Sequence, residues 1–157
     1  MKMKKDLKIC FASSSGGHFK QLMSLSDKMT SYNSFIVTEK KGYDVGSHDR
    51  KTYYLMQVNR QEWNMILKML VNSLRSLRIL SKEKPDVIIT TGALAVIPLC
   101  ILAKKRGVKL IYIESFARVR TESRTGKLLY KYADRFYVQW KYLLKFYPDA
   151  IYIGGVY

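Results

Sequence analysis

Five consecutive residues near the start of the chain offer the first chemistry in the sequence: Ser14, Ser15, Gly16, Gly17 and His18. They follow a short apolar run, 8–13, and precede a segment, 18–29, with apolar residues at helical spacing. Glycines let the backbone approach a ligand closely, and the free N–H groups at a helix start attract anions. The loop therefore favours binding of a phosphate. The alternative is that Ser15 or Gly17 only caps the helix.

His18 stands at the same helix start, where the helix dipole lowers the pKa of an imidazole and keeps the ring neutral. A neutral imidazole accepts a proton, and a positioned general base accelerates a reaction by about 10²–10⁴-fold. His18 is therefore a candidate general base. The alternative is a histidine that hydrogen-bonds only its own loop.

Glu114 and the basic residues after it form a second group. Glu114 follows an apolar run, and a carboxylate there can accept hydrogen bonds from sugar hydroxyls or orient an imidazole; the alternative is an ion pair with a nearby arginine. Residues 118–145 hold eight Lys and Arg against two acids, an excess that favours an anionic partner over a merely solvated face. Arg118, Arg120 and Gly92 are therefore candidate contacts for a phosphate or a phosphorylated acceptor.

A strong helix signal covers residues 62–81, where apolar side chains recur at helical spacing. These side chains are Trp63, Ile66, Leu67, Leu70, Leu74 and Leu77. This face is expected to pack on a sheet and to leave a basic face with methionines outward. A basic amphipathic helix lies well on an anionic membrane, where each cation adds about 1 kcal/mol. The expected membrane contacts are Met65, Lys68, Met69, Arg75 and Arg78. Packing on the sheet alone is the alternative.

Composition narrows the classes of partner. The 157 residues suit one domain, 1–157, and 28 Lys and Arg against 12 acids give a formal net charge of +16. Such a charge attracts polyanions, but no groove-reading or RNA-binding motif occurs, so no nucleic-acid partner is expected. Cys10 and Cys100 are too few and too far apart for a disulfide framework, and no metal-ligand spacing occurs. Neither GxGxxG, GxxxxGK[ST] nor Asp-x-Asp is present, so no metal and no cofactor is expected.

Apolar runs alternate with helical segments along the chain. Strands are expected at 8–13, 34–38, 52–58, 87–90, 110–113, 135–140 and 150–153, and helices at 18–29, 62–81, 94–106, 125–133 and 142–147. The charge-free run 87–103 is interpreted as a buried strand, turn and helix rather than a transmembrane helix, because Gly92 and Pro98 interrupt it. This alternation predicts an α/β fold with a Rossmann-like, doubly wound parallel sheet. Ligands then bind at the carboxyl ends of the strands, in loops 13–18, 90–95, 114–124 and 139–141.

Several motifs resemble the Alg14 family and its relatives in bacterial capsule and exopolysaccharide synthesis. They are Ser14-Ser15-Gly16-Gly17-His18, the run PDVIITTG at 85–92, Tyr112-Ile113-Glu114-Ser115 with Arg118, Thr125-Gly126-Lys127-Leu128-Leu129-Tyr130, Val138-Gln139-Trp140, and Tyr147-Pro148 with Tyr152-Ile153-Gly154. The resemblance covers nearly the whole chain. The sequence is more distantly similar to the acceptor-side half of the lipid-linked GlcNAc transferase of peptidoglycan synthesis.

The resemblance implies the N-terminal half of a GT-B glycosyltransferase, in which an Alg13-like partner subunit holds the UDP-sugar. The pair would transfer a sugar to a polyprenyl-diphosphate-linked acceptor in capsular or exopolysaccharide synthesis. The chain would then be a peripheral protein at the cytoplasmic face of the plasma membrane, in contact with its anionic surface. The alternative is a non-catalytic scaffold that recruits and activates a complete transferase there.

Roles for single residues also follow from the resemblance. His18 and Glu114 would be the catalytic residues, with His18 assisting deprotonation of the acceptor hydroxyl. The loop at 15–17 would face the diphosphate of the acceptor or the phosphates of the donor, and Glu114 and Arg118 would position the sugar or a phosphate. The expected contacts with the partner subunit are Gln139, Trp140, Ile153, Gly154 and Tyr157.

Overall fold

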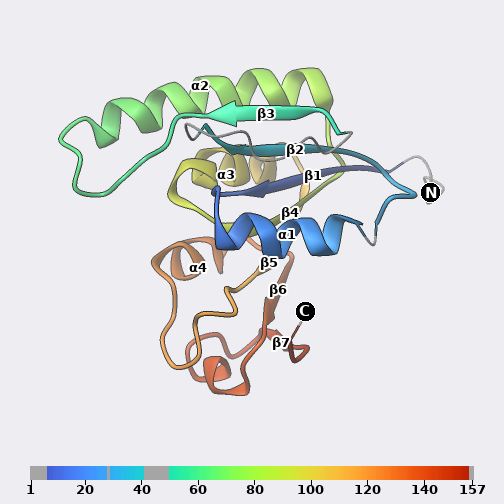
Figure 1. The fold of residues 1–157 in the computed structure, drawn as a ribbon, viewed down its shortest axis with the longest axis vertical. Coiled ribbons are helices and arrows are strands. Elements are labelled where there is room, and N and C mark those ends of the chain that lie inside the picture. Colours follow the sequence, from blue (N-terminus) through green and yellow to red (C-terminus); the bar gives the residue numbers. More distant parts are fainter. Residues whose placement is uncertain (1–6, 28, 41–49, 156–157) are drawn as a thin grey trace.

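The protein is built on one parallel sheet of seven strands, in the order β3-β2-β1-β4-β5-β6-β7 (Figure 1). The structure, a computed structural model, describes residues 7–27, 29–40 and 50–155. The strands are β1 (Lys8–Ser13), β2 (Asn33–Glu39), β3 (Thr52–Leu55), β4 (Val87–Gly92), β5 (Lys109–Ile113), β6 (Arg135–Val138) and β7 (Ile151–Tyr152). All six neighbouring pairs are parallel, which confirms the predicted Rossmann-like sheet.

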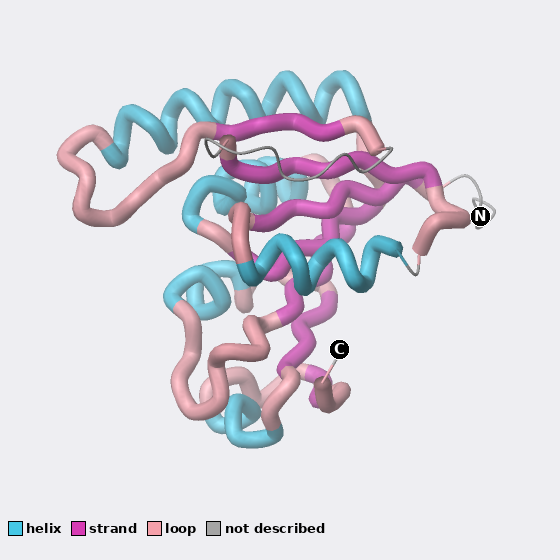
Figure 2. Tube along the Cα trace, viewed as in Figure 1, coloured by secondary structure: helices cyan, strands magenta, loops and turns pink. Residues whose placement is uncertain are grey.

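Helices cover both faces of the sheet (Figure 2). They are α1 (Gly17–Asp27), α2 (Met65–Glu83), α3 (Ile97–Lys105) and α4 (Arg124–Leu129), with short 3-10 helices at Leu94–Val96 and Lys141–Lys145. On one face, α1 packs Phe19, Leu22 and Met23 against β1 and its neighbours. On the other face, α2, α3 and α4 enclose the larger core. The central strands are buried on both sides, which explains why they are almost continuously apolar.

Several predicted elements are shorter than the sequence suggested. The helix expected at 94–106 is divided into a 3-10 turn and α3, with Pro98 in the first turn of α3, where its missing N–H is harmless. The helix expected at 125–133 ends at Leu129, and the strand expected at 52–58 ends at Leu55. The run 87–103 forms β4 and part of α3, as interpreted, and no helix among the described residues is long and apolar enough to cross a membrane.

The orientation of α2 differs from the expectation. Met65 and Met69 pack against the core, whereas Ile66 and Leu70 remain largely exposed. The expectation that the leucine-rich face packs on the sheet and the two methionines face outward is therefore wrong. Arg75 and Arg78 do lie outward, while Lys68 is mostly covered and pairs with Glu62.

Polar side chains on the inner face of α2 explain this orientation. Asn72 is fully buried, where its Oδ1 accepts from the backbone N–H of Met56 and its Nδ2 donates to the carbonyl of Met56, both at 2.9 Å. Glu83 is also buried and pairs with Lys8 at 2.5 Å and with Lys51 at 2.6 Å. Because buried polar groups are costly unless they are hydrogen-bonded, these contacts fix which side of α2 faces the sheet.

Candidate functional site

An open cleft of about 350 Å³ lies at the carboxyl ends of the strands. The chain leaves β1 toward β2 and β3 and returns on the other side of β1 with β4, so the strand order reverses between β1 and β4. Open α/β sheets bind their ligands at such a point. The cleft is lined by Ser14, His18, Glu39, Arg60, Thr91, Gly92, Ala93, Leu94, Tyr112, Arg118, Glu122, Ser123, Arg124 and Thr125.

The loop after β1 contributes only part of its predicted contacts. Ser14 and His18 line the cleft, whereas Ser15, Gly16 and Gly17 are not among its lining residues. Ser15 is buried, and its hydroxyl has no hydrogen-bond partner in the described structure. Gly16 has a φ of +106°, a backbone conformation that favours glycine, so this residue shapes the turn into α1.

His18 keeps a neutral imidazole in the cleft wall. Burial lowers its pKa below the ordinary 6.5; Glu114 opposes this shift, and the positive charge of Arg118 adds to it. The Nδ1 atom is buried without a hydrogen-bond partner in the described structure, so an imidazolium would leave a buried N–H unsatisfied. The expected neutral state is therefore supported, with burial rather than the helix dipole as its main cause.

Gly92 and Tyr112 form the floor between β4 and β5. Gly92 has a φ of +81°, and a Cβ at this position would lie 2.6 Å from the Tyr112 hydroxyl and 3.2 Å from Cγ2 of Thr125. Tyr112 cannot easily move away, because its ring stacks on Phe136 with centroids 4.6 Å apart. A side chain larger than glycine does not fit at position 92, because Tyr112 and Thr125 of the cleft wall lie directly against it. Burial also raises the pKa of Tyr112, so its hydroxyl keeps its proton.

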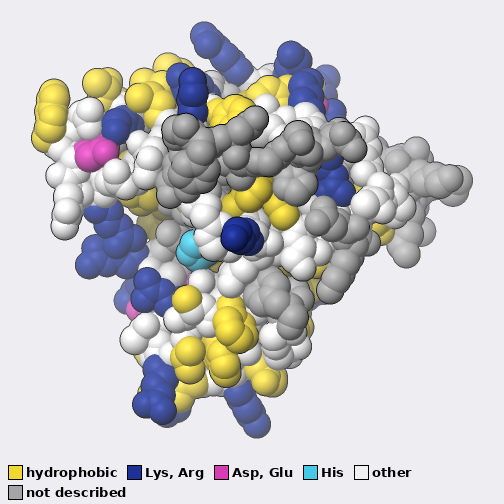
Figure 3. Space-filling view, viewed as in Figure 1, with side chains coloured by type: hydrophobic (Ala, Val, Ile, Leu, Met, Phe, Trp, Pro, Cys, Tyr) yellow, Lys and Arg dark blue, Asp and Glu magenta, His cyan; other side chains and the backbone are white. Residues whose placement is uncertain are grey.

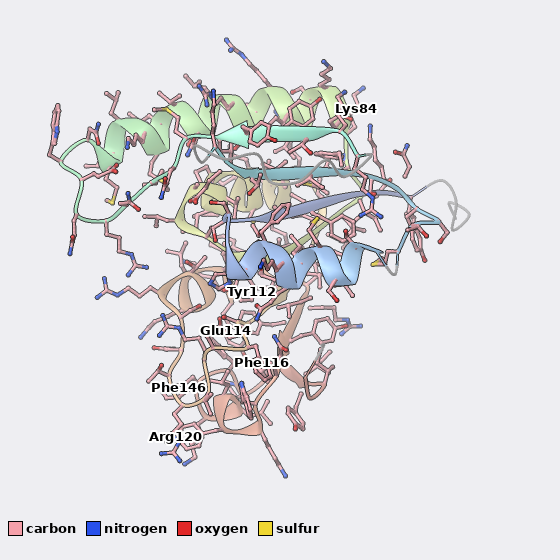
Figure 4. All side chains as sticks on the ribbon, viewed as in Figure 1. Lys84, Tyr112, Glu114, Phe116, Arg120 and Phe146 are labelled. Atoms are coloured by element: carbon pink, nitrogen blue, oxygen red, sulfur yellow. The ribbon has the colours of Figure 1, made fainter. Side chains whose placement is uncertain are left out.

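Three arginines reach the cleft from different segments. Arg60 precedes α2, Arg118 follows β5, and Arg124 begins α4; all three are exposed. Guanidinium groups bind phosphate oxygens with paired hydrogen bonds. Arg120, which was predicted beside Arg118, does not line the cleft, and Figure 4 shows it near the lower end of the molecule, away from Tyr112.

Glu114 lies beneath the cleft and not in it. The side chain is fully buried, and its two carboxylate oxygens accept four hydrogen bonds. Oε1 accepts from the N–H of Ser115 at 2.9 Å, whereas Oε2 accepts from the N–H and the hydroxyl of Ser123 at 3.2 and 2.9 Å and from the Tyr147 hydroxyl at 2.9 Å. A direct catalytic role is therefore wrong for Glu114 in this arrangement: it is a positioning residue.

Ser123 connects Glu114 to the cleft wall through hydrogen bonds. It is the N-cap of α4, and its hydroxyl accepts from the N–H of Gly126 at 2.9 Å. Since that hydroxyl donates to Glu114, the Tyr112 hydroxyl 3.2 Å away donates to Ser123. A Cβ on Gly126 would lie 2.4 Å from Oε2 of Glu114, so only glycine fits there. The order of the 123–125 segment thus depends on one buried carboxylate.

The predicted partner contacts are divided between the interior and the surface. Gln139 is buried and donates to the carbonyl of Glu114 at 2.9 Å, so its assignment to a surface is wrong. Trp140 is half-buried, and its indole N–H donates to the carbonyl of Phe116 at 2.7 Å. Ile153 is 45% exposed beyond the edge strand β7, and Gly154 follows it with a φ of +71°. Tyr157 lies outside the described residues.

Most of the remaining cleft residues lie in the predicted loops 90–95 and 114–124, although sequence reasoning did not single them out; Glu39, Arg60, Tyr112 and Thr125 lie outside those loops. Arg60 carries no sequence signal, because it is an isolated cation in a loop. Arg124 belongs to the basic run at 118–145, Ser123 lies in the predicted loop 114–124, and Thr125 begins the segment 125–133 that was recognised only as a helix. Among the described residues, no group of His, Cys, Asp and Glu side chains is arranged to hold a metal ion.

Comparison with known protein families covers nearly the whole sequence. The family described as "Oligosaccharide biosynthesis protein Alg14 like" matches residues 9–156. The chain belongs to the Alg14 family. A member from Rattus norvegicus, described as "UDP-N-acetylglucosamine transferase subunit ALG14", is 25% identical over 182 residues, which cover 98% of this chain and 84% of the relative. The Alg14 subunit of Schizosaccharomyces pombe is 47% identical over 77 residues, 46% of this chain and 37% of the relative.

Solved structures share the Alg14 fold at low sequence identity. MurG of Acinetobacter baumannii superposes with a TM-score of 0.74 at 14% identity, over 87% of this chain and 42% of MurG. UDP-GlcNAc 2-epimerase of Methanocaldococcus jannaschii gives a TM-score of 0.68 at 14% identity, over 88% of this chain and 41% of that chain. The chain thus spans about two fifths of the solved structures it matches. The fold is that of one Rossmann-like portion of such GT-B chains.

Proposed function

We propose that this chain is the acceptor-side subunit of a two-component glycosyltransferase. A partner subunit, Alg13-like in character, holds a UDP-sugar, and the pair transfers the sugar to a lipid-linked diphosphate acceptor. The observation that carries the proposal is the cleft at the carboxyl ends of the strands, where the strand order reverses. A neutral His18 and three arginines line this cleft. The rat and yeast members are described as subunits of a UDP-N-acetylglucosamine transferase, which supports both the donor class and the need for a partner.

In this proposal the imidazole of His18 removes the proton from the acceptor hydroxyl. The hydroxyl oxygen forms a bond to C1 of the sugar as the bond from C1 to the UDP phosphate breaks, and its electron pair leaves with UDP. Arg60, Arg118 and Arg124 bind the diphosphate of the acceptor and hold its sugar near the base. Tyr112 and Ser123 keep the wall in place.

We assign the partner-facing surface to the end of the described chain. Ile151, Tyr152 and Ile153 are 38%, 49% and 45% exposed on and after the edge strand β7, where an apolar partner surface can pack. In the same proposal, residues 1–157 are one acceptor-side and membrane-side domain that works peripherally at the cytoplasmic face of a membrane. The capsular or exopolysaccharide setting stays a prediction, since the two relatives described above are eukaryotic.

The proposal is tested by coexpressing the chain with the transferase-like protein encoded by a neighbouring gene, copurifying the two, and assaying the pair with a panel of UDP-sugars. His18→Ala should lower transfer at least about tenfold while the pair still copurifies. Lys20→Ala, a change at an exposed position two residues further along α1, is the matched control and should have no effect. Full activity of the His18→Ala pair would reject the acceptor-side role and favour a non-catalytic scaffold.

A further inference from the structure

One side of α2 carries a continuous row of exposed apolar side chains. Trp63, just before the helix, is 95% exposed, and Ile66, Leu67, Leu70 and Leu74 are 71%, 62%, 59% and 61% exposed. Their spacing of three or four residues places them in one line, about 12 Å long from Ile66 to Leu74 at 1.5 Å per residue. We call these five residues the α2 stripe.

Packing among the described residues 7–27, 29–40 and 50–155 does not account for the α2 stripe. The core contacts of α2 come from its opposite side, where Ile79 and Leu80 are buried and Met65 and Met69 pack against the core. Single exposed leucines are ordinary on a protein surface, but a continuous apolar row marks an interaction surface. Hydrophobic and basic side chains lie together along the edge of the molecule that α2 occupies (Figure 3).

Positive charge flanks the α2 stripe on both sides. Arg75, Arg78 and Lys82 are exposed on the flank toward β3, where they line a shallow depression with Tyr53 and Tyr54. On the other flank, Arg106 at the end of α3 reaches back to α2. The only acid within α2 is Glu83, and it is buried. The surface is therefore apolar along its centre and cationic at its margins.

We propose that the α2 stripe docks the protein on an anionic lipid bilayer, with α2 lying in the plane of the interface. Apolar side chains enter the boundary of the acyl chains while the flanking cations contact lipid phosphates. Trp63 fits this arrangement because tryptophan accumulates at membrane interfaces. A second copy fits poorly, since each chain carries a formal net charge of +16 and would meet the same cations.

The place of the α2 stripe relative to the cleft supports this orientation. Helix α2 follows β3 and runs back along a parallel sheet, so its N-terminal end lies at the edge where the strands end (Figure 1). Arg60 lines the cleft and stands only three residues before Trp63. Docking would thus bring the cleft rim to the level of the lipid headgroups, where a lipid-linked diphosphate lies. This last step rests on the proposed function, whereas docking itself does not.

The test is binding of the full chain, without partner or sugar, to vesicles of phosphatidylcholine with and without phosphatidylglycerol. We expect cosedimentation with the anionic vesicles, a blue shift of tryptophan emission that Trp63→Phe abolishes, and weaker binding as salt rises. Leu67→Gln with Leu70→Gln should reduce binding at least about tenfold, because two exposed leucines no longer enter the lipid.

The matched control is Val119→Gln with Leu128→Gln, since these side chains are 42% and 41% exposed elsewhere on the surface. It should bind as the wild type does, and unchanged urea unfolding would show that both double variants remain folded. Docking is overturned if the wild type does not bind anionic vesicles, or if the Leu67/Leu70 double variant binds them as well as the control double variant does. It is also overturned if the α2 stripe crosslinks to a copurified protein and not to lipid. None of these readouts measures sugar transfer, so docking and the proposed function can fail separately.

Discussion

Replacing Glu114 by glutamine tests whether its carboxylate organises the cleft wall. The backbone N–H of Ser115 donates to one carboxylate oxygen, and the backbone N–H of Ser123 donates to the other. In Glu114→Gln, either orientation of the amide turns its NH₂ group toward one of these N–H donors. One backbone N–H therefore loses its acceptor, although the side chain has almost the same size and shape.

The expected cost follows from this loss. A buried N–H left without an acceptor costs about 1–3 kcal/mol, and hydrogen bonds to a neutral amide are weaker than those to a carboxylate. We therefore expect the free energy of unfolding to fall by about 2 kcal/mol. For a chain of this size each kcal/mol corresponds to about 2–4 °C, so the melting temperature should fall by roughly 4–8 °C.

Urea and thermal unfolding followed by circular dichroism measure the effect. Glu122→Gln is the matched control: Glu122 pairs at 2.8 Å with Lys127, whose side chain is 71% exposed, and such surface pairs contribute at most about 1 kcal/mol. If Glu114→Gln unfolds at the same urea concentration as the wild type, the positioning argument is refuted. Lost transfer with unchanged stability would instead restore a direct catalytic role for Glu114.

Three further predictions concern the cleft. Transfer by the complete pair should rise with pH through an apparent pKa below 6.5 and be level at pH 7, because burial favours the neutral, proton-accepting form of His18; His18→Gln should abolish this step. Gly92→Ala should lower the free energy of unfolding by about 1–3 kcal/mol more than Gly107→Ala, since both glycines have a φ near +80° but only Gly92 is crowded. Arg60→Gln should raise the KM for a lipid-linked diphosphate acceptor about tenfold, through loss of a charged hydrogen bond, whereas Arg120→Gln should leave it unchanged.

Each of these predictions has an outcome that contradicts it. A pH step that persists in His18→Gln would assign the base to another group. Equal destabilisation by Gly92→Ala and Gly107→Ala would show that Tyr112 moves aside. Equal effects of Arg60→Gln and Arg120→Gln on KM would mean that the cleft is not where the diphosphate binds.

Much of the fold could be predicted from the sequence because its signals are local. The apolar runs that became β1, β4 and β5 are continuous, and turns or loop residues separate them from the helices. The order of the strands then places the loop after β1 and the loop after β4 at one edge. The position of the cleft, with Ser14, His18, Gly92 and Arg118, therefore follows from periodicity and topology alone.

The rest depends on contacts between residues far apart in the chain. The spacing along α2 predicted a helix, but the inner face was decided by Asn72 and Glu83, whose partners lie on other segments. The position of Glu114 at the end of β5 suggested a site residue, yet its burial arises from Ser123 and Tyr147, which no local pattern connects to it. Arg60 enters the cleft only because a loop beyond β3 folds over it.

The link from Tyr147 through Glu114 to Ser123 also affects how inherited variants should be interpreted. Tyr147 stands 24 positions after Ser123, close in the sequence to the exposed residues Ile151, Tyr152 and Ile153 that we assign to the partner-facing surface. An allele that removes its hydroxyl disturbs the cleft wall, although Tyr147 itself does not line the cleft. Loss-of-function alleles that cluster around Tyr147 therefore cannot be attributed to failed subunit assembly from their position in the sequence alone.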